Sequence, residues 1–130
     1  MTYRWVDHTA ELELHVDAPT PELVLQHALR AFAELAGPAT GEARVHEVEL
    51  EAPDLAALLA QWLEELVFLA ETEGLVPEEA DIVLRNTSGL RATVRGRSGE
   101  PRPLVKAVTY HRLELKHEGG SWWARVVLDV

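Results

Sequence analysis

The chain has 130 residues, no cysteine and a formal net charge of −10, from 22 Asp and Glu residues against 12 Lys and Arg residues. The absence of cysteine excludes disulfides, thiolate nucleophiles and cysteine metal ligands, and the acidic balance argues against tight, independent binding to nucleic acid. No apolar run approaches the roughly 20 residues of a membrane span, and the amino-terminal residues do not resemble a signal peptide, so we expect a cytoplasmic protein without membrane contact.

The amino-terminal third of the chain predicts two strands, a helix and a third strand. Residues 3–17 read as two strands joined by a turn around residues 8–10, because apolar and polar side chains alternate from Glu11 to Asp17. A helix is predicted to begin after Thr20, a good N-cap residue, and to end at Gly37. Residues 42–52 predict a strand with a bulge near His46, where the apolar phase slips.

The rest of the chain predicts one longer helix followed only by strands. The helix begins after Asp54 and ends at Gly74. Its apolar residues recur at helical spacing: Leu55, Leu58, Leu59, Trp62, Leu66, Leu69 and Ala70. Strands are predicted over residues 80–86, 89–97, 105–116 and 122–130, separated by turns rich in Gly, Asn and Ser. We therefore expect one domain over residues 1–130 with an α+β fold, in which two helices cover one face of a curved, largely antiparallel sheet of about six or seven strands.

Charged residues are segregated along the sequence. Residues 85–116 contain eight of the 12 basic residues, whereas the stretch from Glu47 to Asp81 contains 11 acidic residues and no basic one. One interpretation is a solvated strand surface of alternating charge, and the other is a local basic face for an anionic partner or bound phosphate.

The turn between the first two strands contains the densest group of chemically useful side chains. Asp7, His8, Thr9 and Glu11 bring two carboxylates and an imidazole within five positions. Such a turn can form a site for a hard cation. Alternatively, Asp7 and Thr9 satisfy turn amides, and His8 is a packed, hydrogen-bonded histidine.

Two further candidates lie near the carboxyl terminus. Asp129 and the terminal carboxylate of Val130 would form an oxygen-rich corner if the last strand is paired, and would fray into solvent if it is not. Lys106 interrupts an apolar strand. It could contact a phosphate or an acidic partner, or lie on the solvent side of the strand.

Four segments together resemble the archease family, and the resemblance covers nearly the whole chain. They are the turn from Asp7 to Glu11, the helix from Leu58 to Leu66, the stretch from Val105 to His111, and the closing Asp129-Val130. The resemblance implies an accessory protein that promotes GTP-dependent guanylylation of an RtcB-type RNA 3'-phosphate ligase, which joins RNA ends in tRNA splicing or RNA repair. GTP and RNA would be reached only through the ligase, and this chain would not itself be an enzyme.

The resemblance also implies a divalent-cation site where the amino-terminal turn meets the carboxyl terminus. Its expected oxygen ligands, which suit Mg²⁺ or Ca²⁺, are Asp7, Glu11, Asp129 and Val130. His8 would support these ligands without binding the cation, and Lys106 would contact the partner or a phosphate. The family usually has Asp at the position of Glu11, which keeps the ligand charge but adds one methylene. We expect the last strand to pair beside the strand carrying Glu11, placing Asp129 within reach of Asp7.

Two other functions remain open at this point. The chain could be a metal-dependent hydrolase of phosphoesters, with Asp7, Glu11 and Asp129 as ligands and His8 as general base. It could also be a chaperone-like binding module in which the acidic residues are incidental.

Overall fold

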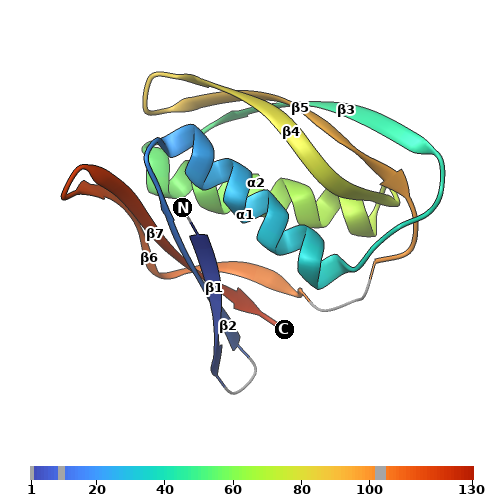
Figure 1. Cartoon of the computed structure of the whole chain (residues 1–130), viewed down its shortest axis with the longest axis horizontal. Coiled ribbons are helices and arrows are strands. Elements are labelled where there is room, and N and C mark those ends of the chain that lie inside the picture. Colours follow the sequence, from blue (N-terminus) through green and yellow to red (C-terminus); the bar gives the residue numbers. More distant parts are fainter. Residues whose placement is uncertain (1, 9–10, 102–104) are drawn as a thin grey trace.

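The computed structural model describes residues 2–8, 11–101 and 105–130, with the side chains of all of these except Asp7 and His8. They form two helices and seven strands (Figure 1). In chain order the elements are β1 (Thr2–His8), β2 (Glu11–Ala18), α1 (Pro21–Ala36), β3 (Ala43–Glu51), α2 (Leu55–Glu71), β4 (Leu75–Arg85), β5 (Gly89–Ser98), β6 (Ala107–Glu118) and β7 (Ser121–Asp129). This confirms the predicted α+β class with two helices.

The strands are divided between two antiparallel sheets instead of forming the single curved sheet that we expected. The first sheet has the strand order β1-β2-β7-β6, and the second has the order β3-β5-β4. The helices lie between the two sheets in Figure 1, and each contacts strands of both. Alternation along a strand predicts which side chains share a face, but it does not predict the partner strand, and so the division was not visible in the sequence.

Local signals begin both helices where the sequence predicts. At α1 the Thr20 hydroxyl accepts a hydrogen bond from the amide of Leu23 at 3.2 Å. At α2 the Asp54 carboxylate accepts one from the amide of Ala57 at 2.8 Å. Each bond satisfies an amide that has no partner within its own helix.

Among the described residues, no helix is both long and apolar enough to cross a membrane.

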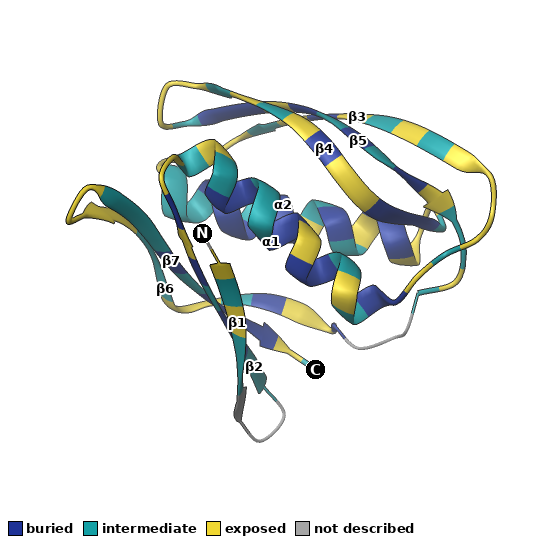
Figure 2. Cartoon of the chain, viewed as in Figure 1, coloured by how far each residue is buried: buried dark blue, intermediate teal, exposed yellow. Residues whose placement is uncertain are grey.

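The core is built from both helices and the strand faces that they cover. Buried positions run along both helices and alternate along most strands (Figure 2). Trp62 is the largest fully buried side chain. Its indole N–H donates a hydrogen bond to the carbonyl of Leu25 in α1 at 2.9 Å. The two helices are thereby joined by a buried polar contact as well as by apolar packing.

Two strands differ from their prediction. The bulge expected near His46 is absent, because β3 pairs with β5 in continuous register from Ala43 to Glu51. The apolar phase slips only because Val45 faces outward and is 63% exposed. In contrast, β4 begins before the predicted residue 80 and contains Pro77, with a register shift between Pro77 and Glu79. Proline is tolerated there because β4 is an edge strand.

We predict that Trp62→Phe lowers the free energy of unfolding by about 1–3 kcal/mol, because it removes a buried hydrogen bond and part of the buried ring volume. Urea denaturation followed by circular dichroism measures this change. Unfolding midpoints that coincide for the two proteins would show that the indole does not help to hold the helices together.

Candidate functional site

The acidic residues near the two ends of the chain meet at one end of the first sheet. Backbone pairing places His8 opposite Glu11, Glu11 opposite Asp129, and Asp129 opposite Ala107. The last strand is therefore internal, with β2 on one side and β6 on the other. This confirms the expectation that β7 pairs beside the strand carrying Glu11, and it favours the paired alternative for Asp129 over fraying into solvent.

Glu11 and Asp129, called the acidic corner below, lie on the face of the first sheet that points away from the helices. The alternate residues Leu14 and Val16 of β2 are buried in the core, so Glu11 faces the other way. Residues directly opposite in an antiparallel pair have Cβ atoms about 4.5–5.5 Å apart, and two like charges at that spacing destabilise the pair. A cation bound between the carboxylates would offset this repulsion.

Carboxylate oxygens such as those of Glu11 and Asp129 are the kind of ligand that Mg²⁺ and Ca²⁺ prefer in proteins. Among the side chains that the structure describes, no group of three or more His, Asp or Glu residues is gathered closely enough to hold a metal. The predicted ligand Asp7 belongs to β1, where its backbone pairs with Leu12, but its side chain and that of His8 lie outside the described residues. Val130 follows β7 and is half-buried. The ligand roles of Asp7 and Val130 stay predictions.

Lys106 lies beside the acidic corner. Its backbone amide donates a hydrogen bond to the carbonyl of Asp129 at 2.7 Å. Its side chain is exposed, and no carboxylate of the described residues forms an ion pair with its ammonium group. A positive charge that is open to a partner thus stands next to two carboxylates.

A buried carboxylate that the sequence did not reveal lies next to the acidic corner. Glu13 shares the outward face of β2 with Glu11, yet it is only 4% exposed. One carboxylate oxygen accepts a hydrogen bond from Arg112 at 2.7 Å, and the other lies 2.7 Å from the Nε2 atom of His15. The alternation of β2 assigned Glu13 to solvent, because it could not reveal what covers this face.

A bulge in β6 covers Glu13. The pairing of β6 with β7 shifts between Thr109 and Glu114, and Arg112 within this stretch has a left-handed φ of 60°. A non-glycine residue pays for that conformation with about 1–2 kcal/mol. The Arg112 guanidinium reaches across β7 to Glu13, and the Arg112 carbonyl accepts a hydrogen bond from Arg125 at 2.9 Å. These contacts hold the bulge over Glu13.

The basic stretch does not form a free cationic face on the second sheet. Its central strand β5 carries arginines flanked by carboxylates on β3 and β4. Arg95 lies 2.6 Å from Asp81 and 3.2 Å from Glu79, and Arg91 lies 3.9 Å from Glu49. The hydrogen bond and the charge of Arg95 hold the pKa of Asp81 below its usual value. The interpretation as a solvated surface of alternating charge therefore holds for this sheet.

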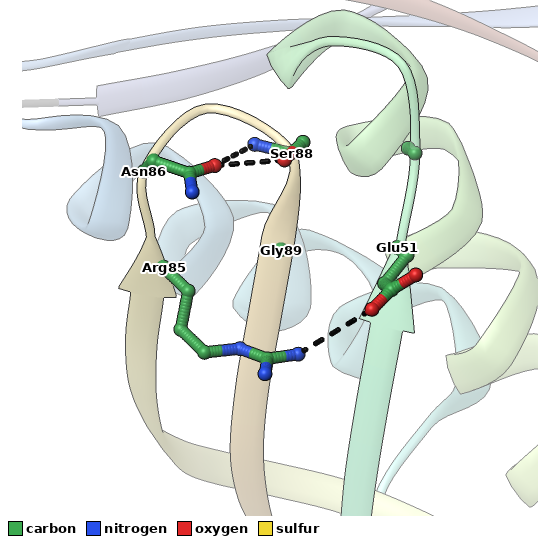
Figure 3. A pocket seen from close by; sticks show the side chains of 6 residues that line it. Glu51, Arg85, Asn86, Ser88 and Gly89 are labelled. Atoms are coloured by element: carbon green, nitrogen blue, oxygen red, sulfur yellow. Dashed lines mark hydrogen bonds and ion pairs between the residues drawn. The ribbon is translucent and has the colours of Figure 1, made fainter.

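A polar hollow lies at the end of the second sheet, and polar groups that line it bond to one another (Figure 3). The Asn86 side-chain oxygen accepts hydrogen bonds from the Ser88 amide at 2.9 Å and from the Ser88 hydroxyl at 2.7 Å. Arg85 approaches Glu51 at 4.0 Å across the hollow. These contacts account for the shape of the turn, and they leave the acidic corner as the better candidate site.

Comparisons with known proteins agree with this picture. A family model described as the archease protein family matches residues 3–130. A protein archease from Methanopyrus kandleri is 35% identical over 140 residues and covers 100% of both chains. A protein archease from Methanosarcina mazei is 33% identical over 140 residues and covers 98% of this chain and 95% of its own.

Solved structures agree as well. The solution structure of Methanobacterium thermoautotrophicum protein 1598 has a TM-score of 0.73 and 29% identity, and the match covers 98% of each chain. The crystal structure of an archease from Thermotoga maritima, described there as a possible chaperone, has a TM-score of 0.63 and covers 100% of this chain and 98% of its own. Its 22% identity supports the fold alone.

We predict that Glu13→Gln lowers the free energy of unfolding by about 1–3 kcal/mol, because a charged, buried hydrogen-bond acceptor is lost. Glu49→Gln removes an exposed carboxylate that pairs with Arg85 on the second sheet, and it should change stability by less than about 1 kcal/mol. Urea denaturation of both variants makes the comparison. Equal changes would mean that the bulge does not shield Glu13.

Proposed function

Because the chain belongs to the archease family, we propose that it is an accessory protein that activates an RtcB-type RNA 3'-phosphate ligase by promoting its metal- and GTP-dependent guanylylation. The observation that carries the proposal is the register that sets Glu11 opposite Asp129. Through it, the strand that begins with Glu11 and the strand that ends with Asp129 meet at one end of the first sheet, and both residues belong to segments that resemble the family.

The acidic corner would hold a divalent cation, Mg²⁺ or Ca²⁺, with Asp7 and the Val130 carboxylate as further oxygen ligands and His8 beside them. When bound, such an ion supplies positive charge that offsets phosphate charge in nucleotidyl transfer. The chain's own contribution is to hold Glu11 and Asp129 on paired strands, where neither can move away from the other. Lys106 would add a fixed positive charge toward a phosphate or an acidic group of the ligase.

The ligase assay tests this proposal directly. Guanylylation of the RtcB-type ligase from the same organism is measured in single turnover, with and without this protein, across Mg²⁺, Ca²⁺ and Mn²⁺ and with GTP or ATP. We expect faster guanylylation that requires a divalent cation. No stimulation under any of these conditions would refute the accessory role.

Two controls separate the alternatives. Hydrolysis of phosphoesters by this protein alone would favour a metal-dependent hydrolase with His8 as base. Binding to unfolded proteins in the absence of metal and of the ligase would favour a chaperone-like module, the activity suggested for the Thermotoga maritima archease.

Removing one carboxylate of the acidic corner should abolish metal binding without disturbing the fold. We predict that Mg²⁺ or Ca²⁺ raises the melting temperature of the parent protein, since a ligand at 100 times its Kd adds about 2.7 kcal/mol of stability. Asp129→Asn should lose both this shift and the stimulation of the ligase. Glu118→Gln, an exposed carboxylate at the other end of the same sheet, is the matched control and should keep both. A normal shift in Asp129→Asn would remove the acidic corner from the proposal.

Lys106 should act on the partner and not on the cation. We predict that Lys106→Ala reduces stimulation of the ligase several-fold and keeps the metal-dependent rise in melting temperature. Lys116→Ala, whose ammonium already pairs with Glu114 and Glu118, should leave both unchanged. Full stimulation by Lys106→Ala would show that this lysine is an ordinary surface residue.

A further inference from the structure

Two exposed aromatic side chains lie on helix α2 and on the neighbouring strand β6. The large apolar residues exposed on the described part of the chain are Val45, Phe68, Val83 and Tyr110. The two valines belong to the second sheet, among its arginines and carboxylates. Phe68 in α2 is 46% exposed and Tyr110 in β6 is 53% exposed. Exposed aromatic residues cost hydration free energy, and they commonly mark a surface that a partner covers.

Phe68 lines a groove of about 300 Å³ between α2 and β6. We call it the α2–β6 groove, and its lining residues are Glu64, Val67, Phe68, Glu71, Thr72, Lys106, Ala107 and Val108. Tyr110 stands at its Glu64 end, where the phenol donates a hydrogen bond to the Glu64 carboxylate at 3.1 Å. Partial burial and this carboxylate raise the pKa of Tyr110, so the phenol stays protonated at neutral pH. The aromatic side chain is thereby fixed beside α2.

The groove and the acidic corner are linked through the start of the edge strand β6. Lys106 lines the groove, and its amide is bonded to the carbonyl of Asp129. Ala107, the next lining residue, pairs with Asp129 in the sheet. A protein that reaches the acidic corner from the side of β6 would therefore also cover the groove.

The charges around the groove define what fits it. Glu64 and Glu71 line it, and Lys106 is the only cation among the described residues of its lining. The stretch from Glu47 to Asp81, which contains all of α2, has 11 acidic residues and no basic one. An apolar centre with an acidic rim complements a segment in which an apolar side chain is flanked by Arg or Lys.

We propose that the α2–β6 groove is the docking surface for such a basic and apolar segment of the ligase. This inference rests on the proposed function, and it deepens it by separating the surface that binds the ligase from the carboxylates that act on its chemistry. A second copy of this chain fits poorly, because a symmetric contact would set the acidic surface of α2 against itself.

The test compares binding with maximal stimulation. Guanylylation is measured as a function of the concentration of this protein, and its affinity for the ligase is measured by calorimetry. Phe68→Ala should raise both the half-saturating concentration and the Kd at least about tenfold, and it should restore the parent rate at saturation. Glu71→Lys should weaken binding in the same direction. Asp129→Asn should instead lower the rate at saturation and leave the affinity for the ligase nearly unchanged.

Val83→Ala is the matched control, because Val83 is 61% exposed on the second sheet, and it should bind as the parent does. Melting temperatures with and without Mg²⁺ establish that each variant is folded and still responds to metal. If the parent stimulates the ligase and Phe68→Ala binds it equally well, the groove is not the docking surface, although the proposed function stands. If the parent neither binds nor stimulates the ligase, both proposals fall. Sedimentation that reveals a parent dimer and a Phe68→Ala monomer would assign the groove to a second copy and overturn the inference.

Discussion

The pairing of β2 with β7 is the interaction on which the candidate site depends. A strand at the end of a chain is ordered only if it is tied to the sheet, and β7 is tied on both sides, to β2 and to β6. The register is fixed by the core, since Leu14 of β2 lies opposite Val126 of β7 and both are fully buried. A slip of one residue would turn these apolar side chains into solvent. Core packing, and not any attraction between carboxylates, therefore holds Glu11 opposite Asp129.

The register sets two carboxylates opposite each other, unlike the pairing of arginine with carboxylate on the second sheet. On the second sheet, arginines of β5 alternate with carboxylates of β3 and β4, and even the buried Glu13 of the first sheet is bonded to Arg112 and His15. Glu11 and Asp129 have no such ion pair among the described residues. Like charges opposite each other on paired strands destabilise a sheet, and under the proposed function a bound cation would offset that repulsion.

Sequence reasoning succeeded where the signal is local. The hydroxyl of Thr20 and the carboxylate of Asp54 cap helices where they were expected to, and alternation from Glu11 to Asp17 groups Leu14 and Val16 on the face that is buried. It failed where the outcome depends on distant contacts. No periodic pattern in the sequence marks the division into two sheets or the bulge that covers Glu13. The start of β4 was missed because Pro77 is unusual within a strand.

Part of the candidate site was also predictable from the sequence. The resemblance to the family selected the residues, and the register brings Glu11 and Asp129 together with Lys106 beside them. The α2–β6 groove was missed. Phe68 lies outside the apolar stripe predicted for its helix, but a stripe does not show which strand lies beside the residues that it leaves out.

Anomalous diffraction tests the proposed cation site at the acidic corner most directly. Crystals grown with Mn²⁺, which accepts the same oxygen ligands as Mg²⁺, should give an anomalous peak between the carboxylates of Glu11 and Asp129. Crystals of Asp129→Asn grown in the same way should lack that peak. A parent crystal with no peak at the acidic corner, or with its strongest peak at another group of carboxylates, would show that Glu11 and Asp129 do not form the cation site.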